Sequence, residues 1–142
     1  MSEASARDCS AIAALHSASF RRGWSEQEVE GLLIDRHVIA HRAITSGKLA
    51  GFIMSRLVED EAEILSVAVV GRQRGRGLAR QLLHLHLRRL AGLGARAVFL
   101  EVDEHNDGGI VVQHRTLWAL KFAADRPHPA QIDIFGPFKI LA

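Results

Sequence analysis

The stretch that most constrains the fold is residues 62–106, which reads as a strand, a glycine-rich turn, a helix and a second strand. Residues 64–70, ILSVAVV, are apolar and rich in β-branched side chains, as expected of a buried strand. Leucines then recur largely along one side of a predicted helix, at Leu78, Leu82, Leu83, Leu85, Leu87 and Leu90. Residues 95–102, ARAVFLEV, read as the second strand. The order predicts a strand-turn-helix-strand unit.

The turn of this unit combines two glycines with a cluster of positive charge. Gly75 and Gly77 lie directly before the predicted helix, and arginines occupy positions Arg72, Arg74, Arg76 and Arg80. The first N–H groups of a helix have no partner within the helix, and the helix dipole adds partial positive charge there. Such a helix start binds phosphate, although two glycines before a helix also occur in ordinary turns. Neither the dinucleotide pattern G-x-G-x-x-G nor a P-loop is complete here, because Arg80 replaces the third glycine and Gly-Lys-Ser/Thr is missing.

The turn closely resembles the acyl-coenzyme A site of the GNAT superfamily of N-acetyltransferases. The family pattern Gln/Arg-x-x-Gly-x-Gly/Ala is matched by Arg74, Gly77 and Ala79. The LEV of residues 100–102 and Asn106 also fall at the family's spacing, which narrows the resemblance to the ribosomal-protein-alanine N-acetyltransferases. The resemblance implies one α/β domain over residues 3–142, with a strong match to about residue 106 and a weak match beyond. It further implies a mixed, mostly antiparallel central sheet with helices on both faces.

The resemblance also implies acetyl-CoA as the acetyl donor, with coenzyme A as the co-product. It assigns cofactor binding to Val67, Val69, Arg74, Gly75, Arg76, Gly77, Leu78, Ala79, Arg80 and Asn106. A backbone N–H near Val69, where the family's strand bulges away from its neighbour, would stabilise the developing oxyanion. Glu101 would be the catalytic base, acting through water. Strand alternation places Phe99 and Glu101 on one face of the sheet and Leu100 and Val102 on the other.

The N-terminal part of the chain supplies further helices and strands. The pattern predicts a helix over residues 9–20, capped by Asp8 or Ser10, and a second helix that starts at Ser25 with Glu28 completing a capping box. Residues 37–44 and 49–58 read as strands joined by a hairpin turn at residues 45–48. With a strand from Glu63 they give three antiparallel strands before the helix.

The sequence that joins the first two helices resembles the opening of the same family branch. Phe20 and Trp24 stand where the family has an HxxSF segment followed by a Trp-Ser pair. In the family this region shapes the groove for the acceptor substrate. A core aromatic residue beside a loop is the structural alternative for Trp24.

The chain departs from the family after Asn106. The family has a tyrosine that protonates the leaving thiolate, but this chain contains no tyrosine, and Gln113 stands at the family's spacing. Residues 117–118 are Leu-Trp in place of the family's Gly-Phe. His114 is an alternative acid, because its pKa normally lies near neutrality. A reading frame altered near Asp107 would also explain the divergence.

Composition excludes several other classes of protein. A net charge of +2, from 18 basic and 16 acidic residues, does not indicate nucleic-acid binding. Cys9 is the only cysteine, so no intrachain disulfide can form and a reducing compartment is permitted. No apolar run is long enough for a membrane span or resembles a signal peptide, which favours a cytoplasmic protein without membrane partners. The eight histidines show no metal-binding spacing, so no metal is expected.

The sequence therefore predicts an acetyl-CoA-dependent N-acetyltransferase. Its expected acceptor is a protein N-terminal α-amine, on resemblance that of a ribosomal protein. An α-amine titrates at about 7.7 to 8.0 and is partly neutral at pH 7, whereas a lysine amine near 10.4 needs more help from a base. Two alternatives stay open: a transferase acting on a small amine or lysine, and an acyl-CoA-binding module with little catalysis.

Overall fold

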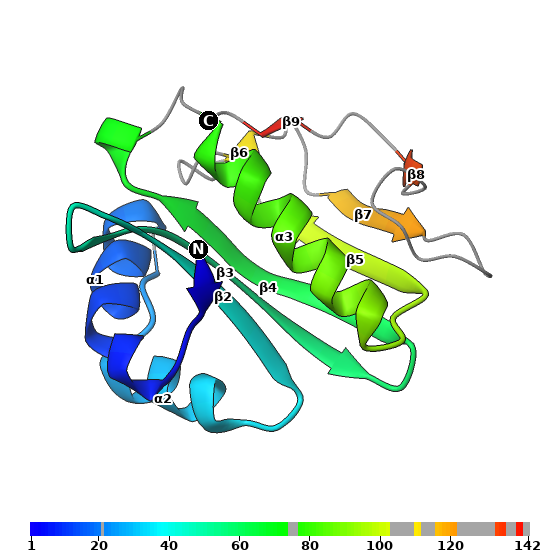
Figure 1. Cartoon of the computed structure of the whole chain (residues 1–142), viewed down its shortest axis with the longest axis horizontal. Coiled ribbons are helices and arrows are strands. Elements are labelled where there is room, and N and C mark those ends of the chain that lie inside the picture. The colour runs from blue at the N-terminus through cyan, green and yellow to red at the C-terminus, as the bar shows by residue number, and fades with distance from the viewer. Residues whose placement is uncertain are drawn as a thin grey trace.

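The computed structural model describes residues 1–20, 22–73 and 77–102, with side chains to residue 99, and four short strands beyond (Figure 1). Its helices are α1 (Cys9–Ser19), α2 (Glu26–Ile34) and α3 (Leu78–Gly92), with short 3-10 turns η1 (Ala6–Asp8) and η2 (Gly71–Gln73). Its strands are β1 (Ser2–Glu3), β2 (Val38–Thr45), β3 (Lys48–Val58), β4 (Glu61–Val69), β5 (Ala97–Val102), β6 (Ile110–Val111), β7 (Thr116–Lys121), β8 (Asp133–Phe135) and β9 (Lys139–Ile140).

The strands form a 7-stranded sheet in the order β1-β2-β3-β4-β5-β7-β8, and β6 pairs with β9 separately. Every neighbouring pair is antiparallel except β4 and β5, which are parallel and joined through α3. The predicted α/β architecture with a mixed, mostly antiparallel sheet is therefore confirmed. Ile110 and Val111 form the short strand β6, in keeping with their β-branched side chains.

Local signals explain the N-terminal elements. Ser46 and Gly47 have φ values of 53° and 77°, the positive pair that a tight two-residue hairpin between β2 and β3 requires. The Ser25 hydroxyl accepts a hydrogen bond from the Glu28 N–H at 3.1 Å, which caps α2 as predicted.

The prediction that a side chain caps α1 is wrong. Asp8 occupies the N-cap position, but its carboxylate makes no capping bond to the helix. It accepts the Ser5 N–H at 2.9 Å and pairs with Arg42 Nη1 at 2.7 Å, so it ties the start of the chain to β2. The ion pair with a neighbouring strand outcompetes the local cap.

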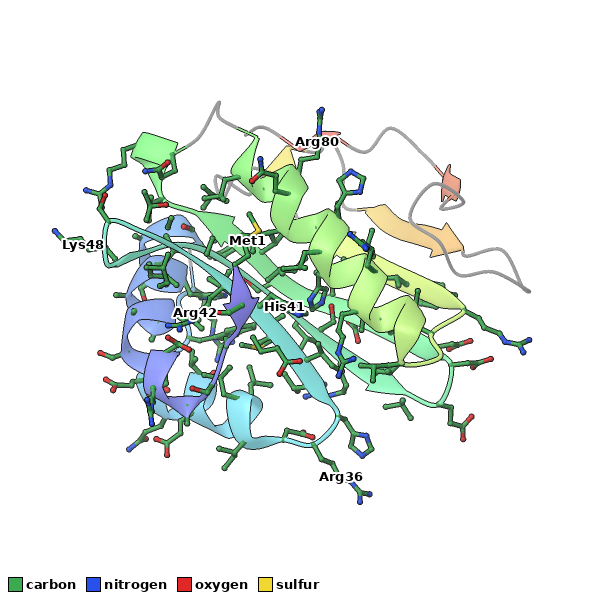
Figure 2. The ribbon with its side chains drawn as sticks, in the orientation of Figure 1. Met1, Arg36, His41, Arg42, Lys48 and Arg80 are labelled. Atoms are coloured by element: carbon green, nitrogen blue, oxygen red, sulfur yellow. The ribbon has the colours of Figure 1, made fainter. Side chains whose placement is uncertain are left out.

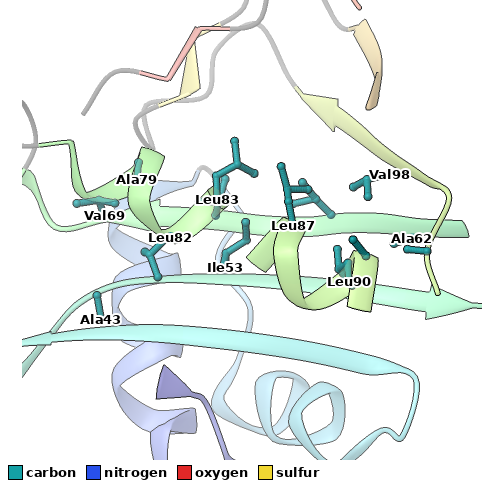
Figure 3. Close-up of a cluster of buried hydrophobic side chains, with 14 of the residues drawn as sticks. Ala43, Ile53, Ala62, Val69, Ala79, Leu82, Leu83, Leu87, Leu90 and Val98 are labelled. Carbon is teal, nitrogen blue, oxygen red and sulfur yellow. The ribbon is translucent and has the colours of Figure 1, made fainter. Parts of the chain in front are cut away.

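Two apolar layers cover the two faces of the sheet, one beneath α3 and one beneath α1 and α2. Figure 3 shows Leu82, Leu83, Leu87 and Leu90 of α3 in the first of these layers, where Leu82, Leu90 and Ile53 are fully buried. The predicted leucine side of this helix is partly wrong, because Leu85 is only half-buried while His86 is completely buried. Burying the apolar side chains of both layers supplies the main stabilisation, at about 25 cal/mol per Å² of apolar surface.

Candidate active site

The central feature of the candidate site is a separation of β4 from β5. The two strands pair from Glu61 with Ala97 up to Ile64 with Leu100. Beyond Leu100, β5 continues to pair with β7, but no further pair with β4 is formed among the described residues. The backbone edge of β4 that follows Ile64 is therefore turned toward an opening in the sheet.

A β-bulge in β4 coincides with this separation. On the β3 side, Met54 pairs with Ser66 and Ser55 pairs with Ile64, which leaves Leu65 as the extra residue. The bulge reverses the alternation of β4, because Ile64 and Val67 both belong to the layer beneath α3. The backbone N–H expected near Val69 to stabilise the oxyanion stays a prediction.

The start of α3 offers the second part of the site. Gly77 is the N-cap residue with a φ of 76°, and its carbonyl accepts the first helical hydrogen bond from Gln81 N at 3.0 Å. The N–H groups of Leu78, Ala79 and Arg80 precede that bond and so have no carbonyl partner within the helix. Among the described residues, a Cβ added at Gly77 would meet no atom within 4 Å, so these residues leave room for a ligand to approach the backbone closely. This arrangement fits the diphosphate of a coenzyme.

The predicted cofactor residues contribute in different ways. Val67, Val69 and Ala79 are 5 %, 0 % and 2 % exposed in the layer between α3 and the sheet, so any contact with a cofactor has to come from their backbone. Leu78 is half-buried against the same layer, while Arg80 is exposed at the start of α3 and points away from the sheet (Figure 2).

Several predicted residues lie outside the described part of the chain. These are Arg74, Gly75, Arg76, Asn106, Gln113 and His114. Glu101 is placed only by its backbone in β5, where it pairs with Leu117 of β7 one residue beyond the last pair with β4. The roles assigned to all of these residues stay predictions.

His16 organises the connection between α1 and α2, and sequence reasoning did not single it out for this role. Its ring stacks on Trp24 at 4.0 Å between centroids and lies 4.5 Å from the ring of Phe20. The Trp24 N–H donates to His16 Nδ1 at 3.0 Å, and burial lowers the pKa of His16 to about 4. The neutral ring thus holds Trp24 in place, with Trp24 packed against the layer beneath α1 and α2.

A second buried histidine lies on the other face of the sheet. His86 Nδ1 is 2.7 Å from Nδ1 of His41, and its Nε2 is 2.6 Å from the Ser55 hydroxyl. Burial, with a smaller effect of the neighbouring His41, lowers the pKa of His86 to about 3, and burial also lowers the pKa of His41. A neutral imidazole has one donor and one acceptor, so His86 satisfies both bonds. Spacing along the helix could not reveal partners 45 and 31 positions away.

An acidic cavity of about 580 Å³ opens at the start of β4 and β5, at the opposite end of β4 from α3's first turn. Arg56, Glu63 and Phe99 are paired in a row across β3, β4 and β5 and line this cavity. Glu59, Asp60 and Glu61 add three more carboxylates at its edge. The cavity therefore has the charge and size to receive a small molecule that carries positive charge.

Comparison with known proteins matches residues 9–111 to the acetyltransferase (GNAT) family. Among solved structures, the ribosomal-protein-S18-alanine N-acetyltransferase from Escherichia coli is 26% identical, with 74% of this chain and 67% of that chain covered and a TM-score of 0.68. GCN5 from Tetrahymena, at 14% identity, covers 86% of this chain and 91% of its own with a TM-score of 0.68. An aminoglycoside 6'-N-acetyltransferase complexed with coenzyme A is 21% identical, with 72% and 58% covered and a TM-score of 0.62. No curated protein matches the sequence.

The fold and the opening beside α3 define an N-acetyltransferase that uses acetyl-CoA as its donor. The chain belongs to the acetyltransferase (GNAT) family, whose match covers most of its length. The alternative of a coenzyme-binding module without catalysis gains no support from these matches. Within the described part of the chain, no helix combines the length and apolar character needed to cross a membrane.

Proposed function

We propose that the protein transfers an acetyl group to the N-terminal α-amine of a protein, and that this protein is ribosomal. The observation that carries the proposal is the similarity, over 74% of the chain, to an enzyme that acetylates the alanine of a ribosomal protein. The LEV motif of β5 and the glycine turn before α3 stand at the spacing of that group of enzymes. A protein N-terminus is also the amine that needs least deprotonation at pH 7.

The chemistry requires few groups from the chain. Acetyl-CoA supplies an acetyl thioester, and the backbone N–H groups at the start of α3 together with Gly77 hold its diphosphate. Glu101 takes one proton, through water, from the amine nitrogen that attacks the carbonyl carbon. The new C–N bond replaces the C–S bond, and the products are the N-acetylated amine and coenzyme A.

The absence of tyrosine bears on the last proton transfer. The chain has no tyrosine to protonate the leaving sulfur, and we propose that water does so. A thiol has a reference pKa of about 8.5, so a thiolate leaves fairly well without a general acid. A positioned acid typically contributes about 10² to 10⁴-fold, so turnover below that of a tyrosine-containing relative is expected.

A small cationic amine is the second candidate acceptor, and the acidic cavity is the observation that favours it. Its four carboxylates, at Glu59, Asp60, Glu61 and Glu63, would attract a polyamine or an aminoglycoside. Phe99 would add an aromatic face for a cation. This acceptor would reach the opening from the start of β4.

One assay separates the two acceptors. The protein is incubated with acetyl-CoA and, in parallel, a peptide that starts with alanine, the same peptide with a blocked N-terminus and an internal lysine, and spermidine. Free thiol and product mass are measured. Turnover of the alanine peptide alone supports the proposal, turnover of spermidine or the lysine peptide alone supports the second candidate, and no thiol release with any amine contradicts both.

We also propose that the acetyltransferase domain spans residues 3–142 and works in the cytoplasm. The family match to residues 9–111 supports the first statement for most of that range. A single cysteine, which permits a reducing compartment, supports the second.

A further inference from the structure

Ser66 carries a buried hydroxyl group that has no hydrogen-bond partner in the part of the chain that the structure describes. The residue is 6 % exposed, so bulk water does not serve as its partner. Buried hydroxyl groups are almost always hydrogen-bonded, because leaving one unpaired is unfavourable. An unpaired one at a candidate site therefore indicates a polar atom that arrives with a ligand.

The position of Ser66 places it beside the opening. It follows the bulge residue Leu65 and lies two positions beyond Ile64, the last residue of β4 that pairs with β5. On the other strand, Glu101 is one position beyond Leu100, the last residue of β5 that pairs with β4. Ser66 and Glu101 thus flank the start of the strand separation from its two sides.

The pairing across β3 shows which face of the sheet Ser66 occupies. Its partner Met54 and the next pair along, Phe52 with Ala68, all belong to the layer beneath α1 and α2. Paired residues on neighbouring strands share a face, so Ser66 lies on the face opposite α3. Phe99 lies in the row of Glu63 and Arg56, away from the α3 layer. That Glu101 shares the face of Phe99 stays a prediction from strand alternation.

We propose that the Ser66 hydroxyl binds the acceptor amine, an assignment that rests on the proposed function. Its Oγ accepts one N–H of the incoming neutral amine, while the amine lone pair stays free to attack the thioester carbonyl. Glu101 acts on another proton of the same nitrogen through water. Acetyl-CoA is bound from the α3 side, so Ser66 does not contribute to its affinity.

The test compares two substitutions of nearly the same shape, Ser66→Thr and Ser66→Val. Only the threonine keeps a hydroxyl group. We expect kcat/KM for the acceptor to be roughly three- to tenfold lower in Ser66→Val than in Ser66→Thr, the range of one hydrogen bond. The KM for acetyl-CoA should be the same in both. The acceptor is the alanine-starting peptide, or spermidine if the wild-type protein acetylates only that.

Ser66→Ala and Ser55→Ala are a matched pair of variants that test how each hydroxyl group affects the stability of the protein. Removal of the unpartnered Ser66 hydroxyl should leave the melting temperature equal or higher while kcat/KM for the acceptor falls. Removal of the Ser55 hydroxyl, which is bonded to His86, should lower the melting temperature and leave both KM values unchanged.

Equal kcat/KM for Ser66→Val and Ser66→Thr, with an active wild-type protein, would overturn the role of Ser66 and leave the proposed function intact. An increased KM for acetyl-CoA in Ser66→Val would overturn it as well, because the contact would then be with the donor. A wild-type protein that acetylates no amine would contradict the proposed function itself, and with it the acceptor assigned to Ser66.

Discussion

The two faces of the central sheet bury different kinds of polar groups. On the face of α3, His41, His86 and Ser55 bond to one another, and the rest of that layer is aliphatic. On the face of α1 and α2, His16 fixes Trp24 at the helix connection, and the buried Ser66 hydroxyl has no partner among the described residues. A face whose buried polar groups satisfy one another stabilises the fold, whereas the unpaired hydroxyl beside the opening is the group that we propose to bind the acceptor.

The largest expected effect concerns Glu101, the proposed catalytic base. If activity did not need Glu101, the proposed contrast between the two faces of the sheet would lose its main support. Glu101→Gln should lower kcat/KM for the acceptor by about a hundredfold at pH 7, because a general base typically contributes about 10² to 10⁴-fold. Melting temperature and acetyl-CoA affinity should stay unchanged. The loss should shrink above pH 8, where an α-amine is already neutral. Glu30→Gln, at an exposed position of α2, is the control, and equal loss in both variants would contradict a role as base.

Lowering the pH should destabilise the packing on both faces of the sheet. Burial holds the pKa of His16 at about 4 and that of His86 at about 3, against 6.5 in the unfolded chain. The unfolded chain therefore takes up protons near pH 6.5 that the folded chain does not, so stability is complete above this pH and declines as the pH falls. Between pH 6.5 and 5 the free energy of unfolding should drop by on the order of 2–4 kcal/mol.

Urea denaturation at several pH values measures this decline. His16→Phe keeps an aromatic ring next to Trp24 and removes one titrating group, so its decline should be shallower than that of the wild type. Gln81→Ala, at an exposed position of α3, removes no titrating group and is the control. A free energy of unfolding that is flat from pH 6.5 to 5 would contradict the burial of neutral histidines.

The α3 face alone is tested by Ser55→Ala. The substitution leaves Nε2 of the fully buried His86 without its partner at 2.6 Å, which should cost about 1–3 kcal/mol of stability. Urea denaturation at pH 7 gives this value. If the variant were as stable as the wild type, the hydrogen-bonded network would not be what stabilises this face.

Local sequence patterns predicted most of the described fold. The hairpin at Ser46 and Gly47, the Ser25 cap and the strand-turn-helix-strand unit around Gly77 each depend on residues close together in the chain. Two expectations failed for the same reason. Asp8 looked like a cap, but it pairs with Arg42 of β2, and Leu85 looked like a core residue, but His86 beside it takes the fully buried position through its bonds to His41 and Ser55.

Residues of the candidate site could be predicted only where they belong to a local sequence motif. The glycine at the start of α3 was found from its spacing, and the structure gives it a positive φ of 76°, while its role in binding a cofactor stays a prediction. The environments of His86 and Ser66 could not be predicted, because they depend on residues of neighbouring strands. Ser66 becomes conspicuous only when the register with Met54 and the end of the β4–β5 pairing are known.

The most direct test compares the affinity for acetyl-CoA of two variants, one substituted at each end of α3. Gly77 at its start and Gly94 after its end have φ values of 76° and 98°, and a Cβ at either would meet no atom of the described residues within 4 Å. Gly77→Val and Gly94→Val therefore impose similar backbone strain, but only the first puts a bulky side chain where the diphosphate is proposed to bind. Calorimetry should show acetyl-CoA binding weakened about tenfold or more by Gly77→Val, as expected for a lost charge-assisted hydrogen bond, and unchanged by Gly94→Val. Equal affinity of the two variants would contradict the placement of the coenzyme at the start of α3.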